Sequence, residues 1–151
     1  YTLDDTRWRY NGIDSLANMR LAVIEGYSYS DEVDAYVEQF KDDPARIVVI
    51  SSAGRAQMNA VSRLVSKKAD VLVEDINVAK LTIGKLNLSD RVVMADVATE
   101  PEALYIACTP ADPRGKKYAD LFSEGIAKLR ASGELATILV KYNLSDWATT
   151  E

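Results

Sequence analysis

The first 100 residues alternate between two hydrophobic periods. Residues 20–25, 46–50 and 70–73 form short apolar runs rich in β-branched side chains, which is typical of buried strands. Between and after these runs, apolar residues recur every third or fourth position and so share one face of a helix. The spacing predicts helices over residues 30–41 and 76–86 and a third between them. The apolar positions are Val33, Tyr36, Val37 and Phe40 in the first helix and Met58, Val61, Leu64 and Val65 in the middle one.

Two further apolar runs, at residues 91–95 and 104–108, bring the predicted strands to five. A regular succession of strand, helix and strand is typical of a parallel sheet covered by helices on both faces. We therefore expect an α/β fold built on a mainly parallel five-stranded sheet. Cys108 lies in the last run and is expected to be a small buried hydrophobe.

The last third of the chain follows a different pattern. Pro113 precedes a long helical repeat, and Gly133 separates it from a second, shorter one. Because no strand lies between these two helices, we expect them to pack as a separate unit.

Composition narrows the functional classes. The chain has 151 residues, of which 48% are hydrophobic and 27% charged, enough for one sizeable core. A net charge of −5 disfavours nucleic acid as a partner, and no apolar run approaches the ~20 residues of a membrane span. With no histidine, Ser-His-Asp and Cys-His catalysis and the common zinc sites are excluded. We predict no enzyme activity, metal or cofactor. A chain that opens at Tyr1 indicates a processed or truncated product.

Asp75, at the end of the third predicted strand, is the first candidate binding residue. Ligands of α/β domains bind at the carboxyl ends of strands, so a carboxylate there suits a cationic group. Asp is also a preferred helix N-cap, and both interpretations remain open. Glu74 should point the other way, toward solvent or a hinge.

The segment after the first predicted strand is the second candidate. Gly26 permits unusual backbone angles, and the helix start beyond Ser28 favours an anion such as a carboxylate. Tyr27 and Tyr29 are placed to stack on a ligand. An ordinary turn with a serine cap explains the segment equally well. Together with Asp75, these residues would complement a zwitterion such as an amino acid.

Four segments resemble one known family. Residues 12–26, 69–75, 104–107 and 129–142 are similar, in order, to motifs of the second lobe of periplasmic solute-binding proteins of the polar amino-acid type, family 3 of the ABC-transporter receptors. The third segment, for example, reads Leu-Tyr-Ile-Ala where the family has Tyr-Gly-Ile-Ala, and the match covers nearly the whole chain.

The resemblance implies one lobe of a type II Venus-flytrap receptor that delivers a small polar ligand to a membrane permease, in a periplasmic setting. It implies a crossover or hinge over residues 1–17, a ligand-binding lobe over 18–108 and C-terminal helices with a tail over 109–151. Asp75 would grip an α-ammonium, and the amides of residues 27–29 would face an α-carboxylate.

Two departures from the family bear on these expectations. No first lobe precedes Tyr1, so the C-terminal helices should expose an apolar face open to self-association. Tyr27, Ser28 and Tyr29 replace the family's small Gly/Thr loop. The alternative function is a sensing or interaction lobe of a signalling receptor with the same fold.

Overall fold

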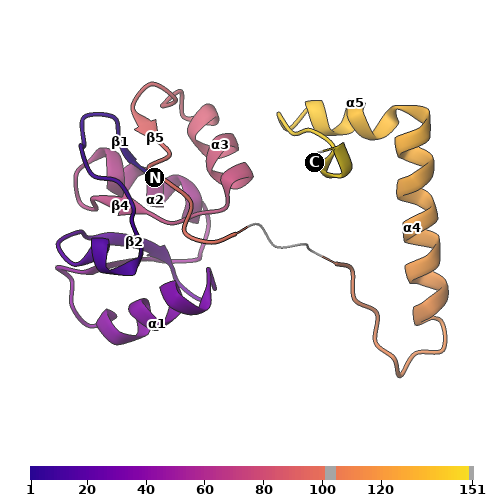
Figure 1. Cartoon of the computed structure of the whole chain (residues 1–151), viewed down its shortest axis with the longest axis horizontal. Coiled ribbons are helices and arrows are strands. Elements are labelled where there is room, and N and C mark those ends of the chain that lie inside the picture. Colours follow the sequence, from indigo (N-terminus) through magenta and orange to yellow (C-terminus); the bar gives the residue numbers. More distant parts are fainter. Residues whose placement is uncertain (101–104, 150–151) are drawn as a thin grey trace. The chain divides into compact units, whose positions relative to one another are not determined.

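The computed structural model describes residues 1–100 and 105–149, and the chain divides into two compact units, residues 1–100 and 101–151 (Figure 1). Each unit is described by itself.

A parallel three-stranded sheet forms the centre of the first unit. Its strands are β2 (Leu21–Ile24), β3 (Ile47–Ile50) and β4 (Val71–Leu72), in the order β3-β2-β4. Leu21 is paired with both Ile47 and Val71, so the three strands start in register. The first three of the five predicted strands are therefore confirmed, with slightly narrower bounds.

A second, two-stranded sheet lies at the edge of β4. Strands β1 (Thr2–Leu3) and β5 (Val92–Val93) pair antiparallel. Tyr1 and Leu72 exchange both main-chain hydrogen bonds, at 2.8 and 2.9 Å, which is the pattern of an antiparallel pair. Strand β1 thus runs opposite to β4 as well as to β5, and β4 and β5 share one direction.

The predicted five-stranded sheet is wrong, because the strands form separate sheets of three and two. The run at 105–108 forms no strand: the side chains of Tyr105 and Ile106 are 87% and 56% exposed, and Cys108 is exposed rather than buried. Leu104 lies outside the described residues. An apolar run becomes a strand only where a neighbouring strand pairs its main chain and packs its side chains.

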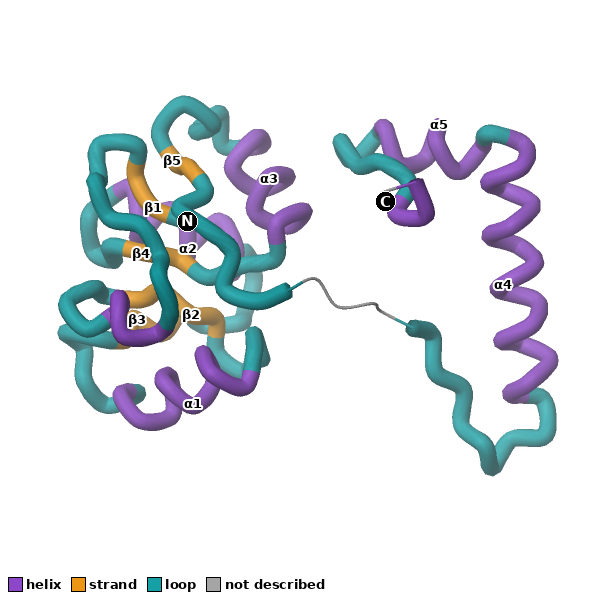
Figure 2. The backbone as a smooth tube through the Cα atoms, in the orientation of Figure 1, coloured by secondary structure: helices purple, strands orange, loops and turns teal. Residues whose placement is uncertain are grey.

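Helices cover both faces of the three-stranded sheet, so the α/β class is as predicted (Figure 2). Helix α1 (Asp31–Phe40) shares a core with Leu21 and Val23. Helices α2 (Ala56–Val65) and α3 (Ile76–Lys85) share the opposite core. Alternate residues of β2 point to opposite faces, which is why both cores draw on this one strand. A 3₁₀ helix, η1 (Ile13–Leu16), adds Leu16 to the α1 side.

The second unit contains α4 (Gly115–Ser132), α5 (Glu134–Val140) and the 3₁₀ helix η2 (Trp147–Thr149). Gly133 separates α4 from α5 as predicted, and its φ of 79° lies in the left-handed region that glycine adopts without steric cost. The guanidinium of Arg130 donates two hydrogen bonds to Asp146, at 2.6 and 3.0 Å, and lies 5.3 Å from the ring centre of Trp147. These contacts join the end of α4 to the segment after α5.

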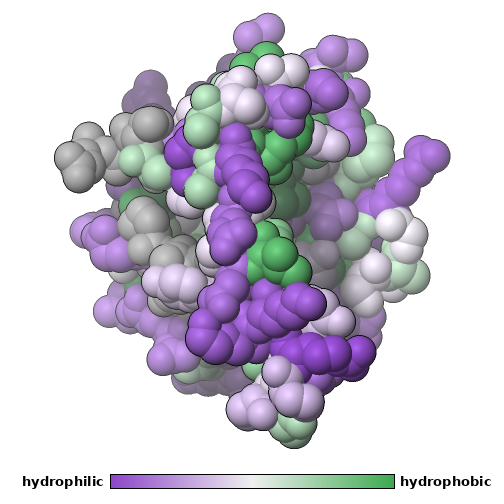
Figure 3. Space-filling model, turned by 90° about the vertical axis from the view of Figure 1, so that its right-hand side faces the viewer, coloured by the Kyte–Doolittle hydropathy of each residue, from purple (hydrophilic) through white to green (hydrophobic). Residues whose placement is uncertain are grey.

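Large apolar side chains of this unit are exposed. No helix within residues 1–100 and 105–149 is long and apolar enough to cross a membrane. The face drawn in Figure 3 is mainly hydrophilic, with hydrophobic residues visible between the polar ones. The exposed apolar residues of α4 and α5 are Tyr118, Leu121, Phe122, Ile138 and Val140.

Candidate functional site

Topology defines the candidate site at the carboxyl ends of β2 and β4. These two strands are neighbours, yet the helices that follow them lie on opposite faces: α1 follows β2, and α3 follows β4. The two connections therefore diverge, which is the arrangement at which open α/β sheets bind ligands. The structure brings both predicted groups, residues 26–29 and Asp75, to this edge.

Asp75 caps helix α3. Its Oδ1 accepts hydrogen bonds from the main-chain N–H groups of Asn77 and Val78, at 2.8 and 3.0 Å. The N-cap interpretation is thus confirmed, and it does not use the whole carboxylate. Both bonds go to the same oxygen, so Oδ2 of this exposed side chain remains available to a cationic group.

The loop after β2 is held by its own side chains. The amide of Tyr27 donates to Ile24 O at 3.1 Å. Asp34 accepts from the amide of Tyr29 at 3.0 Å and from Ser28 Oγ at 2.6 Å. The serine cap is formed by Ser30, whose Oγ accepts from Val33 N.

These contacts limit what the loop offers to an anion. Two of its amides already have acceptors, and the first turn of α1 carries three carboxylates: Asp31, Glu32 and Asp34. Nearby negative charge opposes a bound carboxylate, although the helix dipole favours one. The predicted pairing of this loop with an α-carboxylate therefore remains a prediction that the local charge does not favour.

The two tyrosines of the loop differ in exposure. Tyr27 is 45% exposed, and its Oη accepts from Gln57 Nε2 at 2.9 Å, which ties the loop to α2. The ring of Tyr29 is 6.4 Å from that of Tyr27, and its Oη accepts from Ile24 N at 2.7 Å. Burial is the main reason why the pKa of Tyr29 is raised to about 12. Tyr27 is the ring that a solute can reach.

Arg55, which sequence reasoning missed, adds a positive charge at the same edge. It follows the exposed loop after β3 and precedes α2, whose first N–H groups have no side-chain cap. A cation next to free helix N–H groups favours an anion. The signal was present in the sequence as a basic residue between Gly54 and an apolar helical repeat.

Glu74 was expected to face solvent or a hinge, but its side chain is half-buried. Its Oε1 accepts from Asp75 N at 2.9 Å, while its Oε2 is enclosed without a hydrogen-bond partner in the described part of the chain. Burial, and secondarily the charge of Asp75, raise the pKa of this carboxyl above its usual 4.5. Two carboxylates of different character therefore lie side by side.

Two hollows of the surface lie away from this edge. A groove of about 350 Å³ runs between η1 and α1, and another of about 500 Å³ follows the first half of α4. Across residues 1–100 and 105–149, no three His, Cys, Asp or Glu side chains are grouped to hold a metal ion.

The fold defines an α/β domain with exposed acidic residues after β2 and β4. Comparisons with protein-family models, with curated proteins and with solved structures gave no match.

Proposed function

We propose that the first unit is a solute-binding lobe of an ABC-type transport receptor, which binds an amino acid or a similar small polar solute. The observation that carries the proposal is the divergence of α1 and α3 from neighbouring strands. The loop at residues 26–30 and the exposed side chain of Asp75 both follow the carboxyl ends of these strands. The resemblance of four sequence segments supports the same reading.

In this proposal, Asp75 Oδ2 accepts from the cationic group of the solute, and Tyr27 covers its apolar part. Arg55 and the free N–H groups of α2 are the alternative to the amides of residues 27–29 as the position of the anionic group. A membrane permease as partner and an extracytoplasmic location follow from the resemblance and belong to the proposal. A single lobe contacts only one side of a solute, so we expect a dissociation constant of about 1 mM or weaker, roughly −4 kcal/mol.

A calorimetric titration of the 151-residue chain with single amino acids tests the proposal. Asp75→Asn is the informative variant, because Asn keeps the helix cap and loses the charge. We expect it to weaken binding about tenfold to a hundredfold, since a hydrogen bond to a charged group contributes about 1.5–3 kcal/mol.

Glu25→Gln is the matched control. It removes one charge from an exposed side chain at the same edge and should leave binding unchanged. If both variants bind like the wild type, or if a nucleotide or a metal ion binds in preference to every amino acid, the proposal fails.

A further inference from the structure

Among the described residues, one N–H group donates to the half-buried carboxyl of Glu74. Oε1 receives the main-chain N–H of Asp75 at 2.9 Å. Oε2 is shielded from solvent and, among the described residues, has no hydrogen-bond partner. An ionised carboxylate loses its hydration there without the donors that would replace it, and such a group tends to neutralise instead.

The titratable groups around Glu74 come from three elements. Tyr1, which leads into β1, has a hydroxyl that is also enclosed and unpartnered, and its amino group donates to Leu72 O at 2.8 Å. Tyr29 comes from the loop after β2, and Asp75 begins α3. Burial is the main reason why the pKa of both phenols is raised, and the negative charge of Glu74 contributes to the same direction. The one positive group of this set is already bonded to Leu72.

We propose that Glu74 is a proton-controlled latch at the junction of β1 and β4. As the neutral acid it stays enclosed beside Tyr1, and as the carboxylate it turns out to water and loosens the Tyr1–Leu72 pair. The proton is taken up from solvent and returned to it. It converts Oε2 from an unmatched acceptor into a donor, and the hydroxyl of Tyr1 is another enclosed group without a hydrogen-bond partner among the described residues.

The direction of the pKa agrees with this geometry. Desolvation raises the pKa of Glu74 more than its bond from Asp75 N lowers it. The latch lies on the same edge as Asp75, so its opening would alter the edge on which a ligand is proposed to bind. The inference concerns the fold alone and does not rest on the proposed function.

Two measurements on the 151-residue chain test the latch. The first is a ¹³C NMR titration of the Glu74 carboxyl, which should show a midpoint above 4.5. The second is hydrogen exchange of the Leu72 amide, which donates to Tyr1 O, corrected for the intrinsic pH dependence of exchange. In a chain with one glycine added before Tyr1, which removes the titration of the Tyr1 amino group, we expect the protection factor to fall about tenfold between pH 4 and pH 8, a change of about 1.4 kcal/mol in the free energy of local opening.

Three variants distinguish the effect of Glu74 from the titration of other groups. In a chain with one glycine added before Tyr1, Glu74→Gln should hold the Leu72 protection factor constant to within about twofold between pH 4 and pH 8, well short of a tenfold change. Glu25→Gln should follow the wild type. Burial lowers the pKa of the Tyr1 amino group to about 6. A chain with one glycine added before Tyr1 replaces that amino group by an amide and should keep the Glu74 effect.

The latch is excluded if Glu74 titrates at or below 4.5. It is also excluded if, in the glycine-extended chain, Glu74→Gln leaves the dependence of the Leu72 protection factor on pH unchanged. If Glu74→Gln does not fold, the titration midpoint and the exchange profile of the wild type and of the glycine-extended chain decide the question.

Discussion

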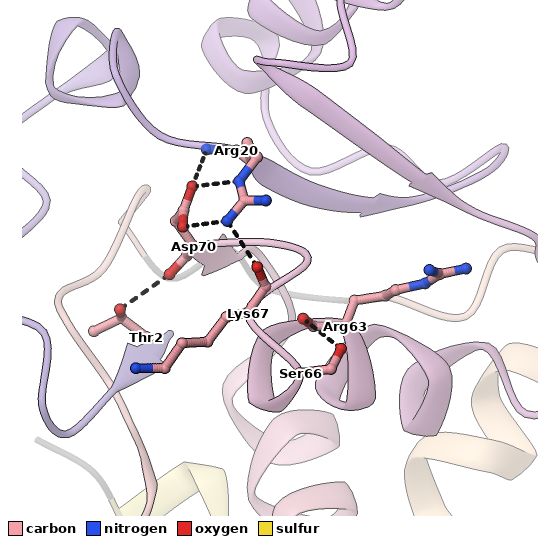
Figure 4. Close-up of polar contacts among 6 residues, drawn as sticks. All are labelled: Thr2, Arg20, Arg63, Ser66, Lys67 and Asp70. Carbon is pink, nitrogen blue, oxygen red and sulfur yellow. Dashed lines mark hydrogen bonds and ion pairs between the residues drawn. The ribbon is translucent and has the colours of Figure 1, made fainter.

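Arg20 and Asp70 clamp the amino ends of the neighbouring strands β2 and β4 (Figure 4). The carboxylate of Asp70 accepts from the main-chain N, Nε and a terminal guanidinium nitrogen of Arg20, at 2.9, 2.9 and 2.8 Å. The main chain of Asp70 contributes too, since its carbonyl accepts from Thr2 Oγ1 at 3.1 Å and its N–H donates to Arg20 O at 2.9 Å. One residue thus connects β1, β2 and β4 at the edge opposite the candidate site.

Replacing Asp70 should therefore destabilise the first unit. Asp70→Asn preserves the shape but loses the paired charge, and it leaves an amide in place of one of the acceptors. We expect the free energy of unfolding to fall by about 1.5–3 kcal/mol, the range for hydrogen bonds to charged groups. Urea denaturation measures the loss, with Asp5→Asn, an exposed ion-pair partner of Lys67 at 3.1 Å, as the control expected to change stability by less than about 1 kcal/mol.

The same pair predicts a dependence of stability on acid pH. Hydrogen bonds from Arg20 are the main reason why the pKa of Asp70 lies below its usual 3.8. A lowered folded-state pKa stabilises the fold above pH 3.8, and this contribution disappears as the pH falls through the folded-state value. The stability difference between wild type and Asp70→Asn should be constant near pH 6 and shrink below pH 4. A difference that grows on acidification would contradict the assignment.

Tyr29→Phe tests how the loop after β2 is anchored. The substitution removes the oxygen that accepts from Ile24 N at 2.7 Å, leaving that N–H without its acceptor at the end of β2. We expect a loss of about 1–3 kcal/mol in the free energy of unfolding. Tyr27→Phe removes a more exposed hydroxyl, bonded to Gln57, and should cost less. Equal effects of the two variants would show that Tyr29 is not the anchor.

Gly133→Ala tests whether the backbone conformation between α4 and α5 stabilises the second unit. At a φ of 79° an alanine is strained, although a Cβ would meet no atom within 4 Å. We expect a cost of about 1–2 kcal/mol from backbone conformation alone. Gly125→Ala lies inside α4 with equally open space and should instead stabilise the helix by about 1 kcal/mol. Thermal unfolding of both variants measures the contrast, and effects of the same sign would argue against a conformational role for Gly133.

The local pattern of apolar residues determined the type and position of most helices and strands. Apolar spacing predicted α1, α2 and α3, and β-branched runs predicted β2, β3 and β4, because helix and strand periods are properties of a few consecutive residues. The break at Gly133 followed from the same reasoning, since glycine adopts the left-handed region without steric cost. The position of Asp75 at a strand end was also evident from the sequence.

Tertiary structure decided which strands found partners. Strand β1 has two residues, too few for a periodic signal, and it exists because Leu3 and Thr2 meet Val92 and Val93 from far along the chain. The run at 105–108 had a stronger pattern and found no such partner among the described residues. The main-chain pairing of Tyr1 with Leu72 of β4 was likewise decided by the tertiary structure. Pairing joins residues some 70 positions apart, so chain geometry decides it and a local window of sequence does not.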